Sequence, residues 1–496
     1  MNSIKILFSL VHSLTKSEKR YFRMISEMQK GQKSYMVLFD LIEKHLDVND
    51  EFIKEINRVF PDNCIEPARK HLYKVLMKSL RQFDSEKDVE TILMNQLHES
   101  RILYHKGLIK LSFDQLERTK KQALHSQKFL YYILAARQEL QYLTYMQFVG
   151  VNESKLLAKQ SKIRELLEQE MKIENHSMLY EVLLLRFLKN GIVRSPAEIA
   201  QLNDILLEEY QITNKPGEPL FKSEQLHLHF QSIYFRMIGN PKGSLEGFYE
   251  LDNLFQNNLH LWKHSPIYYF NLLDGILADL RAMEKYEEMP YFLDRLKNID
   301  TSGNMVPMQN CRSFEYELKI LIDNNKYEDL KISLSEEKLF DNDLAQLPPQ
   351  MRAQFNYTLA LSYFCIREYS KALSILNHEL NQPASLADQS SRINLLLLNL
   401  QVNSLMEKTD YVFYALRSVE RKLKSERKLY HVEQLIISIL KTWLAYKPLD
   451  KYKTRLEILS SSPFEHQLIK DLSLHEWISR LSLKKSGSNE KELQIN

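Results

Sequence analysis

Two histidines four positions apart, His260 and His264 on either side of Trp262, have the spacing that could bind a metal. On one helix, an i, i+4 pair of histidines presents both imidazoles to the same zinc ion. A zinc site needs a third protein ligand, and none of matching spacing lies near this pair. We therefore interpret them as surface histidines beside a loop, and we expect neither a metal nor another cofactor.

The string Gly239-Asn-Pro-Lys-Gly243-Ser244 is the nearest approach to a phosphate-binding loop. A P-loop has Gly-x-x-x-x-Gly-Lys-Ser/Thr directly after a strand, and this string lacks both the lysine position and the strand. We interpret it as a turn between helices. Acidic pairs such as Glu208 and Glu209 are typical of exposed helix faces. No His-Glu-x-x-His, Cys-x-x-Cys or Gly-x-Ser-x-Gly motif occurs, so we expect no enzyme.

The composition indicates an all-α protein. Eleven glycines in 496 residues fall well below the usual share of about 7%, and no stretch alternates polar and apolar residues as strands do. The formal net charge is only +3, so the long-range field that would attract nucleic acid or membrane is weak. The three cysteines match no ligand spacing and fit a reducing compartment. No run approaches the ~20 apolar residues of a membrane span, and we expect a cytoplasmic protein.

Four tyrosines recur at near-constant spacing: Tyr286, Tyr327, Tyr369 and Tyr411, with gaps of 41, 42 and 42 residues. Each lies where one amphipathic pattern ends and a second begins. A fixed period of this length is typical of stacked helical hairpins. The repeat predicts an α-solenoid of such hairpins with a period of about 41–42 residues.

The clearest unit spans Ala353–Pro383. Its first helix should carry Leu359-Ala360-x-x-Tyr363 and its second Tyr369-x-x-Ala372-x-x-x-Leu376, with the small alanines allowing the helices to approach closely. This spacing resembles the tetratricopeptide repeat, although the period exceeds the ~34 residues of that family. The resemblance covers roughly 240–490, and at Tyr286 it is loose because Met289 replaces the small residue and Pro290 intrudes on the second helix.

The resemblance implies a right-handed array whose concave face is lined by the first helices and holds peptides or proteins. Asparagines four apart within a leucine run are poor helix formers. Asn399 and Asn403 therefore either hydrogen-bond a partner in the groove or satisfy buried polar groups against another helix. The inward-facing residues implied by the resemblance are Asn271, Asp274, Arg312, Glu315, Lys319, Tyr357, Asn399 and Asn403.

The pattern divides the chain into an N-terminal helical bundle (1–85), hairpin repeats (86–483) and a flexible tail (484–496). Glycine and proline punctuate the turns of the bundle, and Thr15-x-x-Glu18 is a capping box. Farther along, a helix over Glu153–Met171 should precede a pair that Gly191 breaks, with Ser195 capping the next helix.

The helix Glu66–Phe83 carries a row of cations without interleaved acids, and the bundle holds 15 basic and 11 acidic residues. Like charges at i, i+4 repel by about 0.2–0.5 kcal/mol per pair, so this row indicates either a solvated face or an anionic partner. The basic stripe comprises Lys70, Lys74, Lys78 and Arg81.

Two functions follow from these patterns. The first is a non-enzymatic scaffold that binds a protein or peptide partner along the concave face of the repeats. The alternative is a nucleic-acid-binding regulator in which the N-terminal bundle contacts DNA and the solenoid senses a ligand, although no recognition helix with base-reading side chains is evident.

Overall fold

The structure is a computed structural model of the chain, and it confirms the all-α class. Every regular element in the described ranges is a helix. For residues 2, 3, 338, 339, 389–391 and 484–493 the backbone alone is described. The described ranges are 2–27, 34–45, 47–60, 65–84, 88–213, 220–263, 266–301, 303, 305–382, 389–425, 430–462 and 465–493.

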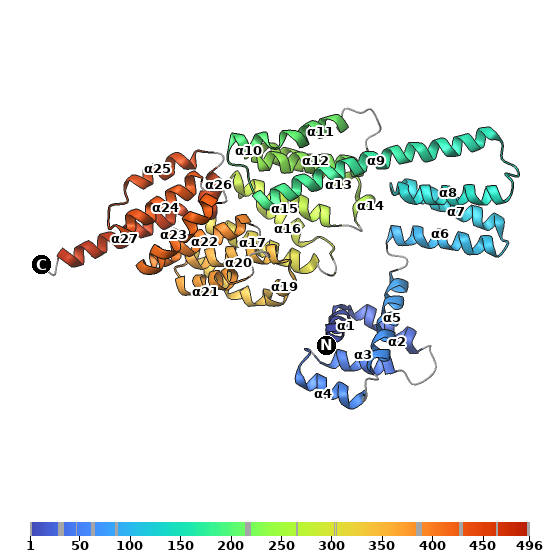
Figure 1. Ribbon diagram of the computed structural model, residues 1–496, viewed down its shortest axis with the longest axis horizontal. Coiled ribbons are helices and arrows are strands. Elements are labelled where there is room, and N and C mark those ends of the chain that lie inside the picture. The colour runs from blue at the N-terminus through green and yellow to red at the C-terminus, as the bar shows by residue number, and fades with distance from the viewer. Residues whose placement is uncertain are drawn as a thin grey trace. The chain divides into compact units, whose positions relative to one another are not determined.

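The chain divides into two compact units, residues 1–170 and 171–496 (Figure 1). In the first unit, five helices enclose one apolar core built on Val11, Phe22, Phe39 and Phe52. Their boundaries follow the turn and capping signals of the sequence to within about two residues. The five helices are α1 (Asn2–Ser13), α2 (Lys16–Glu27), α3 (Ser34–Lys44), α4 (Asp50–Val59) and α5 (Ile65–Phe83).

The predicted capping box starts α2. The backbone N–H of Thr15 donates to the Glu18 carboxylate at 2.7 Å, and the N–H of Glu18 donates to the Thr15 hydroxyl at 3.3 Å. Asn49 caps α4 by accepting from the N–H of Phe52. These reciprocal bonds satisfy backbone donors that a helix start leaves without intrahelical partners.

Three 17-residue helices follow at intervals of 20 residues: α6 (Val89–His105), α7 (Ile109–His125) and α8 (Phe129–Tyr145). Two residues after the end of each helix, the chain has a positive φ, at Gly107, Gln127 and Gln147. The next helix, α9 (Glu153–Asn190), is a single helix of 38 residues where two had been expected. Apolar periodicity continues without a break through Met171, so nothing local stops the helix there.

In the described ranges, the second unit contains eighteen further α-helices and one 3₁₀ helix. Ser195 caps α10 as expected by accepting from the N–H of Glu198. The elements are α10 (Pro196–Ala200), α11 (Asn203–Thr213), α12 (Phe221–Met237), α13 (Pro241–Asn257), α14 (Leu259–Trp262), α15 (Ile267–Ala282), α16 (Met289–Lys297), α17 (Met305–Asp323), α18 (Tyr327–Ser333), the 3₁₀ helix η1 (Leu334–Phe340), α19 (Asp341–Gln346), α20 (Pro349–Cys365), α21 (Tyr369–Leu380), α22 (Gln389–Leu405), α23 (Thr409–Ser425), α24 (His431–Leu444), α25 (Lys451–Ser460), α26 (His466–Asp471) and α27 (Leu474–Leu493).

The turns that join successive helices of this unit share one geometry. Glu284, Asn325, Arg367 and Glu407 all have positive φ, between 55° and 68°. In each turn, the N–H of the next residue donates to the carbonyl five residues earlier, as Glu368 does to Tyr363 at 2.9 Å. This is the Schellman termination, in which glycine is the usual residue. The low glycine content therefore does not exclude left-handed turns here.

The periodic tyrosines lie at these turns. Tyr327 and Tyr369 are the first residues of α18 and α21, and Tyr411 is the third residue of α23. Tyr286 precedes α16, which begins at Met289, so Pro290 occupies the first turn of that helix rather than its interior. Proline is tolerated at this position because its missing N–H would be unpaired there in any case.

The last two helices pack across turns far away in sequence. We call residues 466–481 of α26 and α27 the C-terminal brace. Trp477 is fully buried, and its indole N–H donates to the Ser404 hydroxyl at 3.0 Å. Arg480 donates to the carbonyls of Phe364 and Cys365 at 2.7 and 2.6 Å. Stacking of neighbours alone does not predict these contacts. The helical backbone of α27 continues to Leu493, into the segment expected as a tail.

Three of the four periodic tyrosines contact the brace. The Lys470 ammonium lies 5.0 Å from the ring centre of Tyr286. Tyr327 donates to the Glu476 carboxylate at 3.4 Å. Arg480 donates to the Tyr369 hydroxyl at 3.4 Å. Three of the tyrosines that mark the period in the sequence are therefore also contacts of the last two helices.

Candidate functional site

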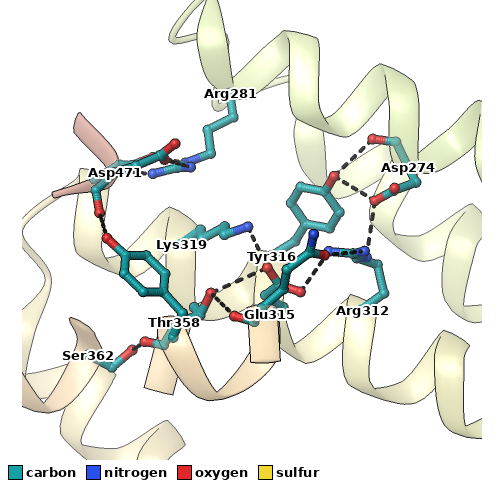
Figure 2. Close-up of polar contacts among 12 residues, drawn as sticks. Asp274, Arg281, Arg312, Glu315, Tyr316, Lys319, Thr358, Ser362 and Asp471 are labelled. Atoms are coloured by element: carbon teal, nitrogen blue, oxygen red, sulfur yellow. Dashed lines mark hydrogen bonds and ion pairs between the residues drawn. The ribbon is translucent and has the colours of Figure 1, made fainter. Parts of the chain in front are cut away.

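A network of charged and hydroxyl side chains joins α15, α17, α20 and α26 (Figure 2). Glu315 on α17 lies at its centre and is 3% exposed. Its carboxylate accepts from Arg312 at 2.8 Å and from Lys319 at 2.5 Å, and the Thr358 hydroxyl donates to it at 3.3 Å. Arg312, Glu315 and Lys319 are three and four residues apart, so one face of α17 presents all three.

The two cations decide the charge of Glu315. Burial by itself would raise the pKa of this carboxyl group. Arg312 and Lys319 outweigh burial and lower the pKa to about 2. Glu315 is therefore ionised at neutral pH and acts as a fixed negative charge rather than as a proton donor.

Asp274 on α15 holds the other side of the network. The Tyr316 hydroxyl donates to its carboxylate at 2.7 Å and to its backbone carbonyl at 2.8 Å. The Arg312 guanidinium lies 3.3 Å from the same carboxylate. Burial raises the pKa of Tyr316, and the negative charge of Asp274 raises it further, so the phenol remains a donor.

A second group of polar contacts joins α15, α17 and α20 to the brace. Arg281 on α15 donates to Asp323 at 2.6 Å and to Asp471 of α26 at 2.6 Å. The Tyr357 hydroxyl donates to the backbone carbonyl of Asp471 at 2.6 Å. Figure 2 shows the Asp471 carboxylate beside the Arg281 guanidinium. The middle of α20, at Tyr357, is thus in contact with this chain's own α26.

Several of these polar contacts join residues one period apart. Arg281 and Asp323 are 42 positions apart, as are Arg312 and Gln354, and Thr358 lies 43 positions from Glu315. Residues about 42 positions apart in the chain therefore meet at several points. Pairing opposite charges at that separation would have pointed to Arg281 and Asp323, which the sequence reasoning did not single out. Asp471 lies outside the period and offered no such signal.

The structure links four of the expected inward residues in one network. Ion pairs join Asp274 to Arg312, Arg312 to Glu315, and Glu315 to Lys319. Tyr357 belongs to a separate group of contacts, in which its hydroxyl donates to the backbone carbonyl of Asp471. Asn271 is half-buried on α15, three residues before Asp274. Of the charged side chains, those of Asp274 and Lys319 are 29% and 22% exposed, against 4% for Glu315. Asp274 and Lys319 are thus the more exposed charges, and the buried Tyr316 and Glu315, respectively, hold them in place.

Asn399 and Asn403 lie apart from this network, buried in α22. The Asn403 amide donates to the Asn399 side chain at 3.0 Å, and the Tyr411 hydroxyl donates to the same oxygen at 2.8 Å. Asn399 in turn donates to Asn377 at 3.2 Å. Of the two alternatives for these asparagines, the contacts favour mutual satisfaction inside the fold.

The basic stripe lies on α5 in the first unit. The four side chains are exposed, and within the described ranges none of them forms an ion pair. The Arg81 guanidinium donates to the Met77 backbone carbonyl of its own helix at 3.2 Å. The buried face of the same helix carries Leu72, Val75 and Leu76. The stripe is therefore a solvated surface whose charges are available to an anion.

Within the described ranges, no group of three or more His, Cys, Asp or Glu side chains gathers as a metal site. His260 lies in α14, and His264 lies outside the described residues, so the pair is not tested as a unit. Within the same ranges, no helix combines the length and the apolar character needed to span a bilayer.

Comparison of the chain with protein-family models, with curated proteins and with solved structures finds no match.

Proposed function

We propose that residues 171–496 form an α-solenoid of tetratricopeptide-like hairpins that serves as a non-enzymatic, cytoplasmic interaction scaffold. In this proposal a segment of a partner protein lies on the face of the first helices, across α15, α17 and the adjacent part of α20. The brace covers the remainder of α20, so the partner site is the portion beside Asn271, Asp274 and Lys319.

Two regularities support a repeating architecture. The Schellman turns at Glu284, Asn325, Arg367 and Glu407 recur at intervals of 41, 42 and 40 residues. Several of the polar contacts between α15, α17 and α20 join residues 42 or 43 positions apart. Repeats that stack in register place equivalent residues against one another in this manner.

The observation that carries the proposal is the accessible edge of the network. Asp274 and Lys319 offer opposite charges on adjacent first helices, and both are held in place by buried partners. Side chains fixed by a second set of contacts lose little conformational entropy when a ligand binds. A peptide that carries both an acid and a base could therefore pair with this edge.

A pull-down with the full chain tests the proposal. The variant Asn271→Ala/Lys319→Ala removes two accessible groups and leaves Arg312 to neutralise Glu315. We expect the captured partner to be lost or reduced at least tenfold. Lys331→Ala is the matched control, because it removes an exposed lysine from the second helix α18. Equal capture by the double variant and the control would contradict the proposed site.

The basic stripe supports a second candidate function, binding of nucleic acid by the first unit. Its four exposed cations span about 16 Å of helix, at 1.5 Å per residue, and a polyanion can neutralise such a row simultaneously. A gel-shift titration with the full chain and Lys70→Glu/Lys74→Glu/Lys78→Glu tests this function. Retardation that weakens with salt and disappears in the variant would support it. No retardation at low salt would leave the interaction scaffold as the remaining proposed function.

A further inference from the structure

Exposed apolar side chains lie on α9 and α11 at the start of the second unit. Figure 1 labels both helices. The side chains are between 38% and 67% exposed. Folded monomers seldom expose contiguous apolar patches, and those that do usually bind a partner there. We call this set the α9–α11 face. It comprises Met178, Val182, Leu185 and Leu188 of α9, and Leu207 and Tyr210 of α11.

The spacing of these residues makes a ridge. Met178, Val182 and Leu185 are separated by four and three positions, so they lie along one side of α9. From Met178 to Leu188 the ridge is about 15 Å long, at 1.5 Å per residue. The length corresponds to about three turns of a helix, and ridges with this spacing fit the grooves of a second helix.

The two helices that carry the face are held firmly together. Arg186 of α9 forms a two-point ion pair with Asp204 at the start of α11, at 3.0 and 2.8 Å. On the inner side, Leu179 and Leu183 share a core with Ile205 of α11. The exposed ridge is thus the outer side of a pre-formed helix pair and needs no rearrangement to bind.

Acidic residues accompany the ridge. Glu174 and Glu181 of α9 and Glu208 of α11 are exposed, and in the described part of the chain none of them forms an ion pair. Glu181 lies three residues after Met178 and four before Leu185, so it borders the apolar row. Because the exposed carboxylates of Glu174 and Glu181 border the apolar row, a complementary ligand is apolar in the middle and positively charged along that margin.

We propose that the α9–α11 face is a docking site for an amphipathic helix with an apolar stripe flanked by lysine or arginine. This site is separate from the network on α15 and α17, and the proposal does not depend on that network. A second copy of the chain fits less well, because the same glutamates would approach one another. Arg186, the cation within this stretch, is already paired with Asp204, and Lys189 lies at the end of α9.

The probe for this test is a fluorescein-labelled 18-residue peptide with leucine at i, i+3, i+4 and i+7 and lysine elsewhere. Fluorescence anisotropy with the full chain should show saturable binding. Leu185→Glu should weaken it at least tenfold, and Glu174→Lys/Glu181→Lys should weaken it and reduce its salt dependence. Ile332→Glu, which alters an exposed apolar residue on α18, should leave binding unchanged. A peptide with glutamate in place of lysine should not bind.

Circular dichroism and urea midpoints establish that the variants remain folded, since all the altered side chains are exposed. Equal affinity of wild type and Leu185→Glu for the lysine peptide would overturn the proposal. A dimer that forms in light scattering and dissociates in Leu185→Glu would also overturn it, because the occupant would then be a second copy. Loss of peptide binding with Lys319→Ala instead would assign the peptide to the other site.

Discussion

Lys319 places its ammonium nitrogen 2.5 Å from the carboxylate of Glu315, one turn earlier on α17. The acid is buried, whereas the lysine reaches the surface of the helix array. The buried carboxylate attracts the accessible ammonium group and fixes its position, and a partner can touch this group. Its behaviour with pH is therefore a direct test of the site.

Lowering the pH should remove stability that Glu315 provides. Its pKa is about 2 in the folded chain against 4.5 for an unperturbed glutamate. A lowered folded pKa gives stability that is complete above pH 4.5 and is lost as the pH falls toward 2. The difference in free energy of unfolding between wild type and Glu315→Gln should shrink by about 1 kcal/mol between pH 6 and 3.5. Urea titrations at both pH values measure it, with Glu317→Gln on the same helix as control.

Gln401 should be replaceable with a gain in stability. It is fully buried in α22, and among the described atoms its amide nitrogen and oxygen both lack hydrogen-bond partners. Gln401→Met keeps the length of the side chain and removes the desolvation cost, so we expect a gain of about 1–2 kcal/mol. Gln309 is the matched control, because its amide donates to the carbonyls of Leu296 and Lys297, both at 2.8 Å. Gln309→Met should destabilise, and a gain at both positions would contradict this account.

Gly275 should tolerate no larger residue. A Cβ built on it would lie 2.4 Å from the ring of Phe248. Within a helix, alanine is normally more stable than glycine by about 1 kcal/mol. Here overpacking should make Gly275→Ala destabilising, by about 1–3 kcal/mol. Thermal unfolding of Gly275→Ala measures the cost. In a Phe248→Ala background the same change should cost little, and an unchanged penalty there would assign the strain to another contact.

Replacing Arg367 by glycine should stabilise the folded chain. It has φ of 68° in the turn between α20 and α21, and its side chain is exposed. Left-handed backbone costs a residue with a Cβ about 1–2 kcal/mol. Arg367→Gly should therefore raise the free energy of unfolding by about 1 kcal/mol, whereas Arg367→Ala keeps the strain and should change it little. A larger gain from alanine than from glycine would contradict the argument.

Arg480 should be essential to the brace. Its guanidinium is buried and donates to two carbonyls at the end of α20. Arg480→Met would leave both without that donor and should cost about 2–4 kcal/mol. Arg480→Lys retains one donor group and should cost less. Urea unfolding gives the energies, and faster proteolysis after Cys365 in Arg480→Met would locate the opening at this turn.

The sequence predicted the local structure of this chain well. Capping by Thr15 and Ser195, the proline in the first turn of α10 and the apolar period within each helix are all properties of neighbouring residues. The resemblance to tetratricopeptide repeats singled out Asp274, Arg312, Glu315 and Lys319, and ion pairs link these residues in the structure. Their binding of a partner stays a prediction.

What the sequence could not show depends on contacts between distant segments. Arg281 meets Asp471 across 190 positions, and Arg480 meets Cys365 across 115. No periodicity relates these pairs. The continuous helix α9 was also missed, because the expected boundary at Met171 rested on local pattern while the observed helix continues to Asn190. Whether Asn399 faced a groove or a neighbour likewise required its partners, Asn377 and Tyr411.

The position of the brace has a consequence for synthesis of the protein on the ribosome. The turns at Tyr286, Tyr327 and Tyr369 emerge long before residues 466–481, which later cover them. During that interval the nascent chain presents an unprotected row of tyrosines and of carbonyls at the ends of helices. The contacts between these turns and the brace can therefore form only after residues 466–481 have left the ribosome.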